Sequence, residues 1–210
     1  MAQLSMKFLN ERINSIETAV KSIEELVKTI DLFKNIAPKK ITITDNTFEL
    51  LGLKWTILDK TDNGYMCLAE RLEYSMQFDK DTNDWRKSSL RKYLDEVFYK
   101  KLIDEIGEDN ILSFTRNLTS LDGQTEYGMA DEYVSLLTVD EYRKYRKLIP
   151  NVNYWWWLIT PWSTPCNDYK TSVTVVSPSG IVGCNCCDYG NDGGVRPFCI
   201  FSSSIFESEE

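Results

Sequence analysis

Three cysteines, Cys184, Cys186 and Cys187, occur within four residues in the stretch CNCCDYGNDGGVRPF, which spans 184–198. Clustered thiols can bind a metal, carry out redox chemistry or serve as contact residues on a surface. Zinc sites commonly use C-x-x-C pairs, because two intervening residues let both sulfurs face one ion. The spacing here is different, and adjacent Cys186 and Cys187 should point to opposite sides of an extended chain. We therefore expect no metal at this cluster.

Catalysis by the same cysteines is also disfavoured. The 210-residue chain has no histidine, which excludes Ser-His-Asp and Cys-His catalysis and histidine-ligated zinc. A reactive thiolate needs a cationic neighbour or a helix N-terminus, whereas Asp188 and Asp192 would oppose ionisation of the nearby thiols. We expect no enzyme activity, no catalytic residue and no cofactor.

The composition limits the partners. A net charge of −8 argues against binding to nucleic acid, which requires clustered Lys and Arg. A hydrophobic fraction of 42% with six tryptophans is enough for a folded core. The chain opens with no signal sequence and contains no apolar run of membrane-spanning length. We expect synthesis in the cytoplasm without membrane insertion, followed by action on a virion or after release.

The elements that position these residues begin with a heptad pattern. Because isoleucine at position d packs poorly in a two-stranded coiled coil, the pattern predicts a parallel homotrimer through residues 6–30. The alternative is an amphipathic helix that packs on its own domain, which Leu26 and Phe33 at position g would favour. The apolar positions are Met6, Ile13, Val20 and Val27 at a, and Leu9, Ile16, Ile23 and Ile30 at d.

After Pro38 the pattern becomes alternating, with a strong hairpin signal at Asp62-Asn63-Gly64. Two helices follow, beginning near Asp84 and Thr138, and short strands return from Tyr154 onward. Strands at both ends with helices between them indicate an α+β domain. We therefore divide the chain into an N-terminal coiled-coil helix, 1–37, and an α+β domain, 38–210.

Both helices have a predicted inner face. For the second, Thr138 is the expected N-cap and Glu141 occupies the capping-box position. The residues expected to face inward are Leu90, Leu94, Val97, Phe98 and Leu102 in the first helix, and Tyr142, Tyr145 and Leu148 in the second.

Other aromatic and cysteine side chains are expected in the core. In the run at 154–157, YWWW, strand alternation places two residues on each face, and we expect one pair to be core. Cys67 and Cys199 lie in strand-like segments and are expected to be buried. A disulfide between Cys166 and one of the later cysteines is a further alternative.

The order of the motifs resembles a known family. FELLGLKWTILDK is followed by W-x-x-S-x-L-R-K-Y-L, by SLLTVDEY, and then by WWWLITPW, VSPSGIV and GGVRPFCIF. This order, over residues 41–201, is similar to a large uncharacterised family of bacteria and their phages. That family resembles the C-type-lectin-like fold shared by formylglycine-generating enzymes and the variable proteins of diversity-generating retroelements. The resemblance implies a C-type-lectin-like domain over 38–210. Ile159 departs from it, because the family has arginine there.

The resemblance also implies a surface of variable side chains. Retroelement diversification acts on adenines, and the residues reachable from asparagine codons match 166–169 and 184–192 at every position. The intervening TSVTVVSPSGIV is expected to form a hairpin turning at 178–180, which would bring the two segments together. The expected ligand-binding residues are Trp162, Cys166, Asn167, Asp168, Tyr169, Cys184, Asn185, Cys186, Cys187, Asp188, Tyr189, Asn191 and Asp192.

These expectations converge on a ligand- or receptor-binding protein, either a phage or prophage receptor-binding protein or a retroelement-diversified one. Its partners would be further copies of itself and an unknown protein or carbohydrate receptor. One alternative is a cysteine-dependent oxidoreductase related to formylglycine-generating enzymes, and another is a purely structural phage subunit. Calcium binding through Asp188, Asn191 and Asp192 also stays open, although the tryptophan-asparagine-aspartate motif of calcium lectins is absent.

Overall fold

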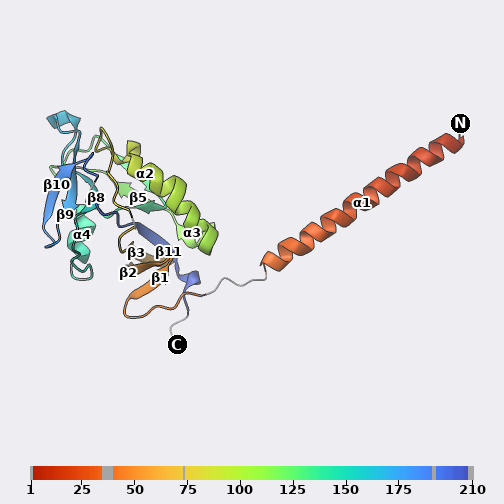
Figure 1. The fold of residues 1–210 in the computed structure, drawn as a ribbon, viewed down its shortest axis with the longest axis horizontal. Helices are drawn as coiled ribbons and strands as arrows, with labels where there is room; N and C mark the ends of the chain where they lie inside the picture. The colour runs from red at the N-terminus through yellow and green to blue at the C-terminus, as the bar shows by residue number, and fades with distance from the viewer. Residues whose placement is uncertain (1, 35–39, 73, 191–192, 208–210) are drawn as a thin grey trace. The chain divides into compact units, whose positions relative to one another are not determined.

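The computed structural model describes residues 2–34, 40–72, 74–190 and 193–207. The chain divides into two compact units, Met1–Lys39 and Lys40–Glu210. The boundary lies two residues after the position expected from the sequence, which was residue 37. Figure 1 shows their elements. No helix within these described ranges has the length and apolar character needed to cross a bilayer.

The first unit contains one long helix, α1 (Ala2–Lys34). Side chains are described at Met6 and at 12–28, so those of Leu9 and Ile30 lie outside the described residues. At the described a and d positions, apolar side chains are exposed in the single chain, with Ile16 62% exposed. A helix with such a continuous apolar stripe typically buries it against another surface.

The second unit is built on a six-stranded antiparallel sheet. Strand β11 (Phe198–Ser202) is central and pairs with β3 (Gly64–Ala69), β4 (Ile111–Leu112) and β7 (Val134–Ser135). The predicted hairpin at 62–64 is confirmed, since it joins β2 (Leu53–Lys60) to β3, and β1 (Thr47–Leu50) pairs with β2. Cys67 and Cys199 lie directly opposite each other in β3 and β11 and are fully buried, as expected.

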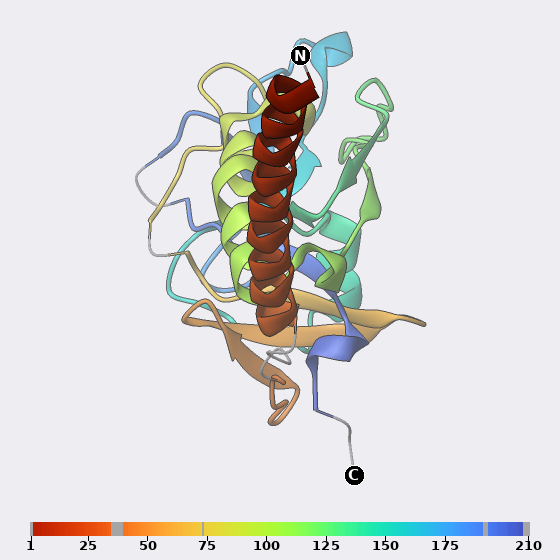
Figure 2. The same ribbon diagram turned by 90° about the vertical axis from the view of Figure 1, so that its right-hand side faces the viewer.

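A second, three-stranded sheet has the order β10-β9-β8, from β8 (Trp156–Pro161), β9 (Ser172–Val176) and β10 (Val182–Cys186). Strands β5 (Phe114–Asn117) and β6 (Met129–Glu132) form a separate pair. Strands and helices in one unit confirm the α+β class. Within this unit, the short 3-10 helix at Pro165–Asn167 lies at the opposite end from β1 and β2 (Figures 1 and 2).

The aromatic run at 154–157 differs from the expected single buried pair. Trp156 and Trp157 are both buried, while Trp155 is exposed. Strand β8 lies between two hydrophobic clusters, so both of its faces are covered. Trp157 contacts Phe78 in one cluster, and Trp156 packs edge-on against Tyr142 in the other.

The predicted helix after Asp84 is present, but it is irregular. Its parts are a 3-10 turn (Trp85–Lys87), α2 (Ser89–Tyr93), a π-helical turn (Leu94–Phe98) and α3 (Tyr99–Ile106). The prediction for Val97 was wrong, because this side chain is 40% exposed. The wider π turn lets every fourth residue face the core, which keeps Leu90, Leu94, Phe98 and Leu102 buried.

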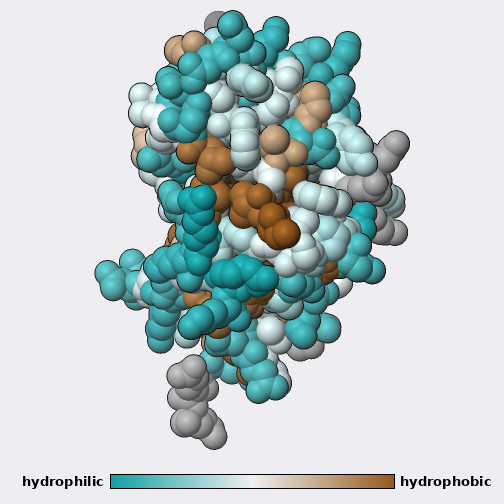
Figure 3. Space-filling model, turned by 90° about the vertical axis from the view of Figure 1, so that its left-hand side faces the viewer, coloured by the Kyte–Doolittle hydropathy of each residue, from teal (hydrophilic) through white to brown (hydrophobic). Residues whose placement is uncertain are grey.

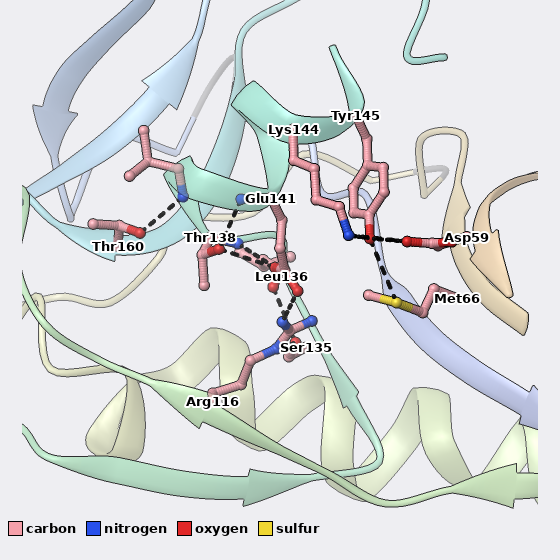
Figure 4. Close-up of polar contacts among 11 residues, drawn as sticks. Asp59, Met66, Arg116, Ser135, Leu136, Thr138, Glu141, Lys144, Tyr145 and Thr160 are labelled. Carbon is pink, nitrogen blue, oxygen red and sulfur yellow. Dashed lines mark hydrogen bonds and ion pairs between the residues drawn. The ribbon is translucent and has the colours of Figure 1, made fainter. Parts of the chain in front are cut away.

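Helix α4 (Val139–Tyr145) confirms the predicted capping box. Thr138 Oγ1 accepts from the Glu141 N–H, and Glu141 Oε2 accepts from the Thr138 N–H. Glu141 Oε1 also accepts from Arg116 Nη1 at 2.5 Å, which joins the helix start to β5 (Figure 4). Leu148 was predicted to face inward but is 42% exposed, and Ile149 is buried instead.

Candidate functional site

A surface pocket of about 490 Å³ lies where the segment after β8 meets the turn at 120–124. Trp162, Asn167 and Tyr169, which line it, belong to the residues predicted from the sequence. Leu121, Asp122 and Ser163 complete the lining. We call the segment 162–171 the display loop.

Asp122 is fixed in the pocket wall by neutral donors. Its carboxylate accepts hydrogen bonds from Ser120 Oγ, from Ser163 Oγ at 2.6 Å and from Asn167 Nδ2 at 2.9 Å. The bonds from Ser120 and Ser163, with a smaller contribution from Asn167, lower the pKa of Asp122 to about 2. The pocket therefore carries a negative charge at neutral pH.

A buried side chain outside the loop holds it in place. Asn83 is fully buried, and its Nδ2 donates to the carbonyl of Ser163 at 2.9 Å and to that of Ser172 at 2.8 Å. The Asn83 N–H donates to the Lys170 carbonyl at 2.7 Å, and Tyr127 Oη donates to Asn83 Oδ1 at 2.7 Å. One amide thus connects both ends of the display loop to the core.

The display loop also has internal order. The 3-10 helix at Pro165–Asn167 ends at Asp168, which has a left-handed backbone with φ of 58°. The Tyr169 N–H then donates to the Thr164 carbonyl at 3.2 Å. Tyr169 is 54% exposed on this fixed backbone, while Cys166, Asn167 and Asp168 are also exposed. The tyrosine ring is therefore available to a partner at little ordering cost.

The second predicted segment is brought next to the display loop. Strands β9 and β10 form the expected hairpin, with the Gly180 N–H bonded to the Ser177 carbonyl at 2.8 Å. Cys186 is the register partner of Ser172, and the Cys187 N–H donates to the Thr171 carbonyl at 2.6 Å. Both segments therefore leave the hairpin at the same end.

The exposure of this second segment is mixed. Cys184, Cys186, Asp188 and Tyr189 are exposed and Asn185 is half-buried, whereas Asn191 and Asp192 lie outside the described residues. Figure 3, viewed from the side of β10, shows a hydrophobic area bordered by hydrophilic side chains.

Cys187 was predicted as a contact residue, and this prediction was wrong. The side chain is fully buried in the core that surrounds Trp157. Strand β10 ends at Cys186, and the chain turns so that the Cys187 carbonyl accepts from the Asp79 N–H at 3.0 Å. Burial first, and then the charges of Cys186 and Asp188, raise the pKa of Cys187 to about 12.

Four of the cysteine thiols have a shifted pKa, and each shift is upward, which disfavours the reactive thiolate. All six cysteines are free. The hydrogen bond from Cys166 Sγ to Glu126 Oε2, at 3.2 Å, raises the pKa of Cys166. Burial raises the pKa of Cys67 and of Cys199 well above the ordinary range. Within the described ranges, no three Cys, Asp or Glu side chains are grouped so that they could hold a metal ion.

A labelling experiment separates the cysteines. We expect a thiol reagent to modify Cys166, Cys184 and Cys186 in the folded protein, and the other three only after unfolding. Cys187→Ser should lower the free energy of unfolding by about 2 kcal/mol, because it buries an extra hydroxyl. Cys184→Ser and Cys186→Ser, the matched surface controls, should change it by less than about 0.5 kcal/mol. Six rapid modifications in native buffer would contradict this arrangement.

Two residues that organise the pocket, Asp122 and Asn83, were not predicted from the sequence. The turn at Asp122-Gly123 is visible in the sequence, but its connection to Ser163 is not. Asn83 binds the carbonyl of Ser163, which is 80 residues further along the chain. No local sequence pattern therefore indicates that Asn83 holds the display loop.

Comparison of the chain with protein-family models, with curated proteins and with solved structures gave no match.

Proposed function

We propose that this protein is a ligand- or receptor-binding protein, with a C-type-lectin-like domain carried on a trimeric coiled coil. Phage receptor-binding proteins and retroelement-diversified adhesion modules are proteins of this kind. The observation that supports the proposal best is the display loop. Its residues Trp162, Asn167 and Tyr169 line one pocket, and buried Asn83 holds the backbone that carries them.

This arrangement suits recognition more than chemistry. A loop that is ordered before binding loses little entropy when a ligand arrives, so more of the contact energy becomes affinity. Tyrosine and tryptophan are the side chains most often found as binding anchors. An oxidoreductase would instead need an ionised thiol, and the raised pKa values of Cys166 and Cys187 weigh against one.

The exposed stripe of α1 supports assembly into a trimer. Three weak sites on one stalk gain avidity, because binding of the first raises the effective concentration of the others. Isoleucine at the d positions Ile16 and Ile23 favours three strands over two.

Light scattering tests the assembly. We expect the full chain to be a trimer and a chain starting at Lys40 to be a monomer. Ile16→Asn should dissociate the trimer, because it places a polar amide at each of three packed d positions. Thr18→Asn, a change at the exposed outer f position, should leave the trimer intact. A monomeric full chain would exclude the stalk, and a trimer without α1 would place the interface elsewhere.

Binding itself is tested with the full chain on arrays of immobilised glycans and peptides. We expect retention on a defined subset of ligands that the same ligand in solution competes away. A chain that retains no ligand, or a peptide of residues 1–39 that retains the same ligands, would contradict the proposed function.

A further inference from the structure

The charge of the pocket indicates the class of ligand. Asp122 forms no ion pair with a Lys or Arg of the described residues. Its charge is stabilised by the neutral groups of Ser120, Ser163 and Asn167 and by its own backbone N–H. A carboxylate without a counter-ion in a pocket wall attracts cations and repels anions. Phosphate, sulfate and carboxylate ligands are therefore disfavoured.

The carboxylate of Asp122 is open to a ligand on its exposed side. Oδ2 of Asp122 accepts two bonds, from Ser163 Oγ and Asn167 Nδ2. Oδ1 accepts one bond from another residue, Ser120. Asp122 is exposed, so a donor group of a ligand can approach Oδ1 from the solvent. A ligand with N–H groups supplies such a donor.

The rings on the other walls complete a cation site. Trp162 and Tyr169 line the same pocket, and no cation of the described chain lies over either ring. An ammonium group is attracted to the face of an aromatic ring, most strongly to that of tryptophan. The apolar part of the rings also accommodates the methylene groups that carry an amine.

We propose that this pocket binds a primary alkylammonium group of the kind that a lysine side chain of a protein receptor presents. The ammonium donates to Asp122 Oδ1, and its alkyl stem lies against Trp162 and Tyr169. A volume of about 490 Å³ leaves room for the stem as well as for the charged group. This assignment rests on the proposed function and specifies its ligand.

Neighbouring charges favour the same class. Asp168 is exposed on the display loop, and exposed Glu126 contacts that loop through Cys166. Lys170 is the one basic residue in the display loop and is also exposed. Arg86 interacts with Glu126 and offsets part of its charge, whereas the charges of Asp122 and Asp168 attract cations to the pocket.

The test is a titration of the full chain with Nα-acetyl-lysine methylamide, followed by NMR of the tryptophan indole N–H groups. The Nε-acetylated form of the same probe has nearly the same shape but no charge, and it should bind at least tenfold more weakly. Asp122→Asn should weaken binding of the charged probe about tenfold. Asp104→Asn is the matched control, because it removes an exposed carboxylate on α3 that does not line the pocket. It should change the affinity less than twofold in physiological salt.

Three results would overturn the assignment. Equal binding of the two lysine probes would show that charge is not recognised. Equal effects of Asp122→Asn and Asp104→Asn would show dependence on net charge instead of a pocket contact. Tighter binding of choline or methyl glucoside than of the charged lysine probe would assign the pocket to a quaternary ammonium or a sugar.

These failures are distinct from failure of the proposed function. If the lysine probe does not bind but the arrays still show specific retention, the ammonium assignment alone is wrong. Tyr169→Leu, which keeps an apolar side chain but removes the aromatic face, separates the ring contribution. It should weaken binding of the charged probe several-fold, and an unchanged affinity would count against the cation site.

Discussion

Replacing Asn83 by alanine is expected to lower the free energy of unfolding by about 3 kcal/mol and to abolish ligand binding. The substitution removes the buried side-chain amide. The carbonyls of Ser163 and Ser172 then lose their donor, and Tyr127 Oη loses its acceptor. Each buried polar group that loses its partner costs about 1–3 kcal/mol, and water entering the cavity offsets part of this. Urea denaturation measures the loss.

The controls isolate the role of the amide. Asn83→Asp keeps an acceptor for Tyr127 but replaces the donor with an oxygen that faces two carbonyls, so it should be at least as harmful as alanine. Asn117→Ala changes an exposed asparagine and should have a small effect. A loss below about 1 kcal/mol for Asn83→Ala would show that the loop does not depend on this residue.

Arg116→Ala is expected to destabilise the domain by about 4 kcal/mol. The guanidinium is 4% exposed and pairs with Glu141, and Ser135 accepts a further bond from its Nε at 2.7 Å. It also lies over the rings of Phe114 and Phe198, at 4.5 and 4.2 Å from their centroids. The substitution removes this packing and leaves Glu141, at the start of α4, without its counter-ion.

An exposed pair on the same helix supplies the control. Arg143 and Asp140 form an ion pair at 3.2 Å, and both side chains are largely exposed. Arg143→Ala should cost less than about 1 kcal/mol, because solvent screens the pair. Equal effects of the two substitutions in chemical denaturation would contradict the assigned role of Arg116.

The features that could be predicted from the sequence are local ones. The capping box at Thr138 and Glu141 joins residues three apart, and the hairpins at 62–64 and 178–180 depend on turn residues within four positions. Strand alternation also places Cys184 and Cys186, two residues apart, on the same exposed face of β10. That Cys187 is a core residue was not predictable, because it depends on where β10 ends and what lies beneath the turn.

The rest of the site depends on contacts between distant parts of the chain. Asp122 meets Ser163 across 41 residues, and Asn83 meets Ser172 across 89. Likewise, both faces of β8 are buried because two separate clusters enclose it, which the pattern WWWLI does not reveal. The sequence therefore predicted three of the six residues that line the pocket, but not Asn83 and Asp122, which organise it.

If the display loop is a preformed recognition surface, Tyr169 contacts the ligand directly, and the affinity of Tyr169→Ala measures that contact. The measurement is binding of the full chain to a ligand retained on the arrays, made together with a thermal melt. Tyr133→Ala, another exposed tyrosine, is the matched control. The account predicts that Tyr169→Ala weakens binding at least tenfold with a nearly unchanged melting temperature, and that the control binds normally. Unchanged affinity, or a large fall in melting temperature, would contradict it.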